Sequence, residues 1–356
     1  MSTVVIMANS ITELGGATRV AHVLASGLAS RGHRVELVGL EMSAEPHTFA
    51  STADFGQTTL LPTPVPSASD EDGRARADAQ ITDGLASILE HLGGGTVITT
   101  QVWCKEMLDR VPHDSWRVVG QYHSSAEAAE RSGDRERLLA AYGDATVVTL
   151  LTETDAKAFA SWGLESVQAM PNPVAFWPDS PSGLTDLVVT YLGRMSVEKA
   201  PGILAAAWEK VAPLHPQWRL RFIGSGPLTE EIRSMNLPRV QFVEPTQNPQ
   251  SYLLGSSVLA LPSLVEGFPL ALAEAMACGL PAVVADASAG VRELVDDDVT
   301  GLLAVRGDAD DFAHQLDRLL SDETMRARMG RAARMAAEAY RLDPILDRWE
   351  MLLHRE

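Results

Sequence analysis

Short apolar runs alternate with amphipathic stretches along the whole chain. In the first 60 residues this pattern predicts a strand in TVVIMAN, a loop in ELGGATR, a helix in RVAHVLASGLASRG that ends at Gly32, and a second strand in RVELVGL. Apolar runs return in TVITTQV, RVVGQYH and ATVVTLL, and Thr152 with Asp155 predicts an N-cap for the helix after the last run. Strands that alternate with helices predict a parallel, doubly wound α/β sheet.

Two stretches interrupt this alternation. Residues 62–80 are rich in proline, serine and charge, which predicts a surface loop leading into a helix. Residues 171–186 concentrate proline, glycine and serine without periodicity and are the predicted linker. Beyond the linker a second series of apolar runs begins, with helices expected near 201–212 and 228–235. We therefore expect two Rossmann-like domains, residues 1–175 and 176–339.

Composition narrows the class of protein. At 356 residues, 46% of them hydrophobic, the chain is long enough for two globular cores. Two cysteines, Cys104 and Cys278, are too few for a disulfide framework and favour a reducing cytoplasm. The N-terminus resembles no signal peptide, and no apolar run reaches the ~18 residues of a membrane span. A formal net charge of −18 disfavours nucleic acid as a partner and leaves at most peripheral membrane association, so we expect a soluble cytoplasmic protein.

Two glutamates, Glu266 and Glu274, stand eight positions apart in LPSLVEGFPLALAEAMACGLPAVVAD. Pro269 can open a helix here, Gly279 can close it, and Pro281 stops it from resuming. This arrangement puts Glu266 at the helix N-terminus, where free N–H groups and the helix dipole suit a phosphate, and Glu274 inside the helix. Carboxylates on either side of a phosphate can accept hydrogen bonds from sugar hydroxyls, which indicates a nucleotide-sugar site.

This segment resembles the Glu-x7-Glu motif of the retaining GT-B glycosyltransferases of family 4, the group 1 type. The resemblance covers essentially the whole chain and is strongest over residues 186–305. It implies a GT-B fold, in which two Rossmann-like domains face a cleft and a C-terminal helix, residues 340–356, crosses back to the first domain. The first domain is then the acceptor side and the second binds the donor. The implied donor-binding residues around the catalytic Glu266 are Gly267, Phe268, Pro269, Leu270 and Glu274.

The segment YLGRMSVEKAPG places Arg194 directly after a predicted strand and Lys199 five residues later. Two cations on such a loop can clamp a diphosphate and stabilise the charge of a departing nucleoside diphosphate. They match the Gly-Arg…Glu-Lys segment of the family, which implies that both are catalytic. Glu198 between them is equally explained as a plain surface acid.

Glycines follow two of the predicted strands, Gly15 and Gly16 in the first domain and Gly224 and Gly226 in the second. A tight turn explains such pairs as well as a ligand does, and it is the resemblance that implies donor binding. Thr229 stands where a dinucleotide fingerprint needs its third glycine, which favours a nucleotide-sugar over NAD and disfavours an oxidoreductase. One departure from the family is the pair Glu244-Pro245, which replaces a glycine in the loop that skirts the nucleotide base.

His123 ends the apolar run RVVGQYH. A histidine at a strand terminus is more often structural than catalytic, but the resemblance implies that it meets the donor sugar. Gln101, Trp103 and Lys105 follow another strand, and their types would suit an acceptor with hydroxyls, although a half-buried core tryptophan is an equal explanation. The spacing of acids and histidines indicates no metal site, and Asp70, Glu71 and Asp72 are expected in a solvated loop.

The resemblance therefore predicts an enzyme that transfers a hexosyl unit, with retention and without metal or cofactor, from a nucleoside diphosphate sugar, most simply UDP-linked. The predicted acceptor is a hydroxyl of a glycan, a cell-surface polymer or a natural product. The segments QYHSSAEAA and LLTETDAKAFASWG are similar to actinobacterial enzymes that glycosylate cell-surface polyol-phosphate polymers. A nucleotide-sugar 2-epimerase and a non-catalytic nucleotide-sugar-binding subunit share the architecture and remain alternatives.

Overall fold

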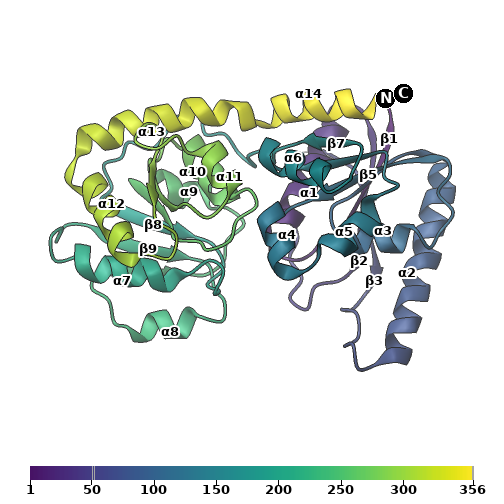
Figure 1. Cartoon of the computed structure of the whole chain (residues 1–356), viewed down its shortest axis with the longest axis horizontal. Coiled ribbons are helices and arrows are strands. Elements are labelled where there is room, and N and C mark those ends of the chain that lie inside the picture. Colours follow the sequence, from purple (N-terminus) through teal and green to yellow (C-terminus); the bar gives the residue numbers. More distant parts are fainter. Residues whose placement is uncertain (50, 52, 355–356) are drawn as a thin grey trace. The chain divides into compact units, whose positions relative to one another are not determined.

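The structure is a computed structural model, and it describes residues 1–49, 51 and 53–354. The chain divides into two compact units. The N-terminal unit comprises Met1–Ala175 together with Leu342–Glu356, and the C-terminal unit comprises Phe176–Arg341. Each unit is built on a parallel β-sheet with helices packed against it (Figure 1), which confirms the predicted α/β fold class.

In the described part of the N-terminal unit, the strands lie in the order β3-β2-β1-β4-β5-β6-β7 and pair in parallel. The register sets Val4 of β1 opposite Val35 of β2 on one side and opposite Thr96 of β4 on the other. The strands are β1 (Thr3–Ser10), β2 (Arg34–Glu41), β3 (Gly56–Leu61), β4 (Gly95–Thr99), β5 (Trp116–Tyr122), β6 (Val147–Leu150) and β7 (Val167–Ala169). The helices are α1 (Gly16–Ser30), α2 (Glu71–Leu92), α3 (Val102–Leu108), α4 (Ala126–Ser132), α5 (Arg135–Tyr142), α6 (Glu153–Ser161) and α14 (Leu342–Leu353).

Strand β1 shows why the apolar runs form a sheet that is covered on both faces. Ile6 packs into a cluster with residues of α1 and α14, whereas its neighbour Met7 packs into a second cluster with residues of α2 and α3. Both side chains are fully buried. Because successive side chains of a strand point to opposite faces, a strand buried on both sides has to be apolar at consecutive positions.

Helix α14 packs on α1 and completes the apolar cluster on one face of the N-terminal sheet. Leu346 and Trp349 of α14 are each 1% exposed. A Cβ atom on Gly27 of α1 would lie 2.8 Å from Cδ1 of Leu346, so the glycine permits a close approach of the two helices. The guanidinium of Arg31 forms ion pairs with three carboxylates of α14, on Asp343 (3.2 Å), Asp347 (2.6 Å) and Glu350 (2.8 Å). The helix begins at Leu342 rather than at residue 340.

The loop predicted over residues 62–80 is wrong in its second half, because α2 begins at Glu71. The carboxylate of Asp70 accepts a hydrogen bond from the amide of Gly73 at 2.9 Å and so caps the helix. Glu71 and Asp72 occupy the first turn, where the helix dipole favours acidic side chains. These acids are therefore a helix cap and a first turn, and the prediction that they lie in a solvated loop is wrong. The predicted cap of α6 is confirmed, since Thr152 accepts from the amide of Asp155 at 2.9 Å.

The described C-terminal unit has the strand order β10-β9-β8-β11-β12-β13, again in parallel. Trp208, Trp218, Phe222 and Phe312 lie in one apolar cluster on a face of this sheet. The strands are β8 (Val188–Leu192), β9 (Arg219–Ile223), β10 (Val240–Val243), β11 (Val258–Leu261), β12 (Ala282–Ala285) and β13 (Leu302–Ala304). The helices are α7 (Pro201–Val211), α8 (Thr229–Ser234), α9 (Gln250–Leu254), α10 (Leu270–Ala277), α11 (Ala289–Leu294), α12 (Ala309–Ser321), α13 (Glu323–Ala337) and the 3-10 helix η1 (Glu338–Tyr340).

The predicted linker over residues 171–186 is irregular throughout, as its composition indicates. Beyond Phe176 it is attached to the C-terminal unit. The ring of Trp177 lies against two guanidinium groups, those of Arg334 (4.8 Å) and Arg341 (4.9 Å), in cation–π contacts. The amide of Ser182 donates to the carbonyl of Cys278 at 2.7 Å.

Candidate active site

The candidate site of the C-terminal unit lies at the carboxyl ends of β8 and β11. The chain runs from β8 outward to β9 and β10 and returns to β11 on the other side of β8, so the strand order reverses between β8 and β11. In open parallel sheets, ligands bind at the loops that flank such a switch point. The loop after β8 carries Arg194 and Lys199, and the loop after β11 carries Glu266.

Lys199 and Glu266, predicted from separate motifs, meet in the structure. Nζ of Lys199 lies 2.7 Å from Oε1 of Glu266. The lysine side chain is 30% exposed and the glutamate side chain 9%. A cation and a nearly buried carboxylate thus meet at the switch point, and each stabilises the charge of the other.

Arg194 is exposed and, among the described residues, its side chain has neither an ion pair nor a hydrogen bond. Its backbone, in contrast, is fixed. The hydroxyl of Tyr191, which is 1% exposed, donates to the carbonyl of Arg194 at 2.7 Å. Burial, and then the charges of Glu266 and Glu198, raise the pKa of Tyr191, so its hydroxyl stays protonated and able to donate. Tyr191 is not among the predicted site residues, although its position three residues before Arg194, at the end of an apolar run, is a signal in the sequence.

Glu198 ties the loop after β8 to the loop after β11. Its carbonyl accepts hydrogen bonds from the amides of Leu264 (2.8 Å) and Val265 (3.3 Å). Its carboxylate accepts from the hydroxyl of Ser196 at 2.6 Å. Burial opposes ionisation of this group, but the hydrogen bond from Ser196 and the positive charges of Arg194 and Lys199 together lower the pKa of Glu198. The backbone of Glu198 therefore joins the two loops, and its exposed carboxylate, held ionised, accepts a hydrogen bond from the hydroxyl of Ser196 in its own loop.

Gly224 and Gly226 have a structural reason to be glycine. Gly224 has φ +125°, and a Cβ atom there would lie 2.1 Å from the carbonyl oxygen of Gly193. Gly226 has φ +158°, and a Cβ atom there would lie 2.5 Å from the carbonyl oxygen of Met195. The amide of Met195 also donates to the carbonyl of Ser225 at 2.9 Å. The two glycines therefore let the loop after β9 lie against the loop that carries Arg194, and their predicted contact with the donor remains a prediction.

The loop from Gly267 to Leu270 leads into α10. Pro269 is the N-cap residue and Leu270 is the first helical residue, so the proline precedes the helix instead of opening it from within. The ring of Phe268 meets the ring of Tyr340 edge-on, with centroids 5.3 Å apart. Glu274 lies within α10 and is 2% exposed. The first-turn amides and the positive end of the dipole of α10 stand next to Glu266, an arrangement that favours a bound anion.

The N-terminal unit has a matching switch point between β1 and β4. Gly15 is the N-cap of α1 and Gly16 its first residue. Gly15 has the extended φ of −146°, and a Cβ atom there would meet nothing within 4 Å, so the fold itself does not demand glycine. The side chain of Gln101, which follows β4, accepts a hydrogen bond from the amide of Asn9 at 2.7 Å and joins the two loops.

His123 follows β5 with both ring nitrogens buried, and neither has a hydrogen-bond partner in the part of the chain that the structure describes. Desolvation by burial lowers its pKa to about 4. The imidazole is therefore neutral near pH 7 and carries one donor and one acceptor that a bound molecule could engage.

The predicted acceptor role of Lys105 is wrong. Lys105 lies within α3 and is 1% exposed, and its ammonium forms ion pairs with Asp109 and, at 2.7 Å, with Asp144. A buried ammonium with two carboxylate partners is a structural cation and does not offer donors to a substrate. Trp103 packs, half-buried, against the apolar cluster of α2 and α3, which fits the structural explanation of this residue.

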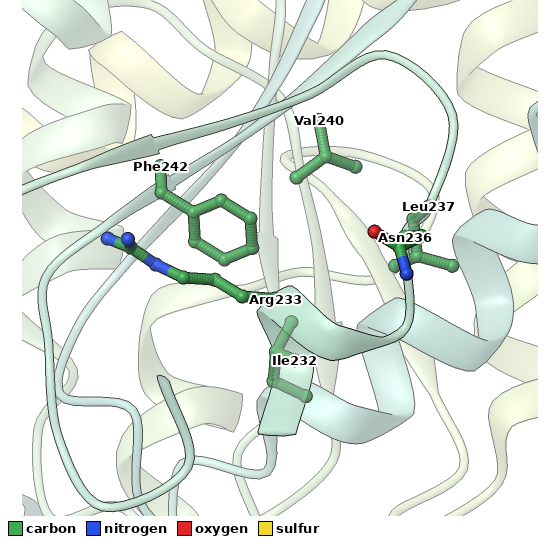
Figure 2. Close-up of a pocket in the computed structure, with 6 residues that line it drawn as sticks. All are labelled: Ile232, Arg233, Asn236, Leu237, Val240 and Phe242. Carbon is green, nitrogen blue, oxygen red and sulfur yellow. The ribbon is translucent and has the colours of Figure 1, made fainter. Parts of the chain in front are cut away.

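Glu244, where the chain departs from the family, forms an ion pair with Arg233 at 3.3 Å. The guanidinium of Arg233 lies over the ring of Phe242 at 5.1 Å. The side chains of Arg233 and Phe242 line a small pocket of about 180 Å³ between α8 and β10 (Figure 2). Its lining contains none of the predicted site residues; it consists of Ile232, Arg233, Asn236, Leu237, Val240 and Phe242.

The described residues contain no group of three or more histidine, cysteine, aspartate or glutamate side chains placed to hold a metal ion. None of their helices combines the length and the apolar character that a membrane crossing requires.

The chain is similar to known glycosyltransferases in sequence and in structure. Residues 178–336 match the family model for glycosyl transferases group 1. An uncharacterized glycosyltransferase of Haemophilus influenzae is 28% identical over 53% of this chain and 55% of its own length. The amylovoran biosynthesis glycosyltransferase AmsD of Erwinia amylovora is 30% identical over 60% of this chain and 63% of its own length. The crystal structure of the S. aureus TarM G117R mutant in complex with fondaparinux, alpha-GlcNAc-glycerol and UDP superposes with a TM-score of 0.83, at 13% identity and with all of both chains covered.

These comparisons establish the fold of the chain and show that its C-terminal unit is similar to group 1 glycosyltransferases. The match over residues 178–336 agrees with the resemblance that the sequence shows to this family. The chain has the GT-B fold that the sequence predicts.

Proposed function

We propose that this protein is a retaining glycosyltransferase that moves a hexosyl unit from a UDP-linked sugar to a hydroxyl acceptor. The observation that carries the proposal is the cluster at the switch point between β8 and β11. There an exposed Arg194, the Lys199–Glu266 ion pair and the N-terminus of α10 lie in one unit, which also matches the glycosyltransferase family model. Positive charge and free amides suit a diphosphate, and carboxylates suit the hydroxyls of the attached sugar.

Each residue has a defined part in the proposed reaction. Arg194 and Lys199 bind the diphosphate and stabilise the charge that develops as it departs, which supplies the positive charge without a metal ion. Glu266 holds hydroxyls of the transferred sugar, and Glu274 holds the ribose. His123 and the loop of Gly15 and Gly16 belong to the N-terminal unit and are proposed to meet the donor sugar and diphosphate.

Retention follows if both bond changes occur on one face of the sugar. The bond from the anomeric carbon to the phosphate oxygen breaks, and the acceptor oxygen bonds to the same face of that carbon. The acceptor proton passes to the departing phosphate oxygen, so no enzyme carboxylate has to become a covalent intermediate. A polymer or glycan hydroxyl is the proposed acceptor. Support for this class comes from AmsD, named for amylovoran biosynthesis, and from TarM, whose complex contains UDP and alpha-GlcNAc-glycerol.

Turnover with a panel of donors tests the proposal. The full chain is incubated with UDP-glucose, UDP-galactose or UDP-N-acetylglucosamine, and with the ADP- and GDP-linked counterparts. Polyol phosphates and oligosaccharides serve as acceptors. We expect release of UDP that depends on the acceptor, and a product whose anomeric configuration, read by NMR, equals that of the donor. An inverted product would overturn retention, and an isomerised donor without UDP release would establish the epimerase alternative.

Site variants connect the activity to the proposed cluster. Arg194→Ala should lower kcat by about a hundredfold, because a positioned cation that meets charge in the transition state contributes about that much. The matched control is Arg331→Ala, which removes an exposed arginine of α13 in the same unit. Equal activity of the two variants would refute the role of Arg194. Bound UDP with no turnover on any acceptor would favour the non-catalytic subunit.

A further inference from the structure

The two cations of the loop after β8 are in different states. Arg194 is exposed, and its side chain makes no ion pair with any other described residue. Lys199 is held by the carboxylate of Glu266 at 2.7 Å. A diphosphate therefore finds one cation open and the other already bound to an acid.

Glu198, which precedes Lys199 in the loop after β8, does not share the role of Glu266. The carboxylate of Glu198 accepts a hydrogen bond from the hydroxyl of Ser196 at 2.6 Å. Among the described residues it forms no ion pair with Lys199. Glu266, with a side chain only 9% exposed, has Lys199 as its cation. Glu266 and a bound phosphate therefore compete for the ammonium of Lys199.

Displacing Glu266 from Lys199 costs more free energy for a nucleoside diphosphate than for an intact nucleotide-sugar. A nucleoside diphosphate that takes Lys199 leaves a nearly buried carboxylate without a cation and with little water, which is unfavourable. An intact nucleotide-sugar takes Lys199 with its phosphate and at the same time offers sugar hydroxyls to the carboxylate of Glu266. Both members of the pair then have new partners.

We infer that the Lys199–Glu266 ion pair determines specificity, by disfavouring the nucleoside diphosphate product relative to the intact nucleotide-sugar. The inference rests on the proposed function of this site. After transfer the hydroxyls leave Glu266, and the re-formed pair returns Lys199 to the carboxylate, which weakens the hold on the diphosphate. The pair thereby promotes product release as well as donor selection.

Isothermal titration with UDP as the probe tests this inference. The proteins are the wild type, Glu266→Gln, Lys199→Gln and the double variant, with Glu209→Gln on α7 as the matched control for an exposed glutamate of the same unit. We expect Glu266→Gln to bind UDP about tenfold more tightly than the wild type, since a freed ammonium gains one charge-assisted hydrogen bond to phosphate. The same substitution in the Lys199→Gln background should leave the affinity nearly unchanged.

Two results would overturn the inference. One is an unchanged or weaker affinity of Glu266→Gln for UDP. The other is equal tightening in the Lys199→Gln background, which would reflect only the removal of a negative charge near the phosphates. If Lys199→Gln fails to fold, Lys199→Arg provides the second measurement, because it keeps the pair and should retain the wild-type preference. A wild type that binds neither UDP nor another nucleoside diphosphate would instead refute the proposed function itself.

Discussion

Replacing Tyr191 by phenylalanine removes one buried hydroxyl and keeps the ring. That hydroxyl donates to the carbonyl of Arg194 at 2.7 Å, and Tyr191 is 1% exposed at the end of β8. The substitution therefore loosens the backbone of the residue whose guanidinium is proposed to meet the diphosphate, and it leaves that guanidinium in place. The variant therefore tests the contribution of the position of Arg194 while its positive charge is kept.

The expected loss of stability depends on the hydrogen bond that the carbonyl of Arg194 keeps in the variant. The amide of Ser196 still donates to it at 3.1 Å, so the oxygen is not left without a partner. The cost in stability should then be that of one neutral hydrogen bond, about 1 kcal/mol, without a further penalty for an unsatisfied buried group. A small displacement of a cation from the reacting phosphate lowers kcat much more than binding, so we expect kcat to fall by about tenfold with KM little changed.

Urea denaturation and steady-state kinetics measure the two effects side by side. Tyr252→Phe is the matched control, because the hydroxyl of Tyr252 makes no hydrogen bond with other described residues. A Tyr191→Phe protein with the expected loss of stability but unchanged kcat would show that the backbone anchor does not serve catalysis. An unchanged free energy of unfolding would show that the hydrogen bond itself contributes nothing.

Further predictions concern the N-terminal unit. Gly27→Ala places a Cβ atom 2.8 Å from Leu346 and should destabilise the protein by about 1–3 kcal/mol through overpacking, less the gain in helix propensity, as measured by the denaturant midpoint. Lys105→Met should leave the KM for the acceptor unchanged, because the ammonium is buried against Asp109 and Asp144; a large rise in that KM would restore an acceptor role. Because the pKa of His123 is lowered from 6.5 to about 4 in the folded protein, the unfolded chain binds the extra proton first, so stability present above pH 6.5 should be lost as the pH falls toward 4. Unfolding free energies at several pH values should show this loss in the wild type and a smaller one in His123→Phe.

The sequence predicts the fold most reliably where both faces of a strand are buried. Apolar runs such as those of β1 and β11 have no other stable place in a soluble domain, so their pattern is unambiguous. Strand β3, with the sequence GQTTLL, lies at the edge of its sheet and is mostly only half-buried, so it lacks that signal and was missed. The start of α2 was missed because Asp70 and its neighbours suit a loop and a helix cap equally well.

The candidate site was predictable residue by residue but not as an arrangement. Arg194, Lys199 and Glu266 were found because each follows an apolar run and matches a family motif. The pairing of Lys199 with Glu266 depends on the strand order, which brings the loops after β8 and β11 together although β9 and β10 lie between them in the sequence. Lys105 was misjudged for the same reason, since Asp144, which helps to bury its charge, lies on a distant segment of the chain.

Helix α14 has a consequence for the order of events during synthesis. The first 175 residues are translated before the C-terminal unit, yet the apolar face of α1 is covered by residues of α14, which follows that unit in the sequence. The ribosome has therefore made the entire C-terminal unit before this cluster can close. Until then Leu24 and Leu28 of α1 lack the cover that Leu346 and Trp349 provide in the finished protein. The nascent chain accordingly exposes the apolar face of α1 until α14 has been made, and chaperones that recognise apolar segments can bind there during that time.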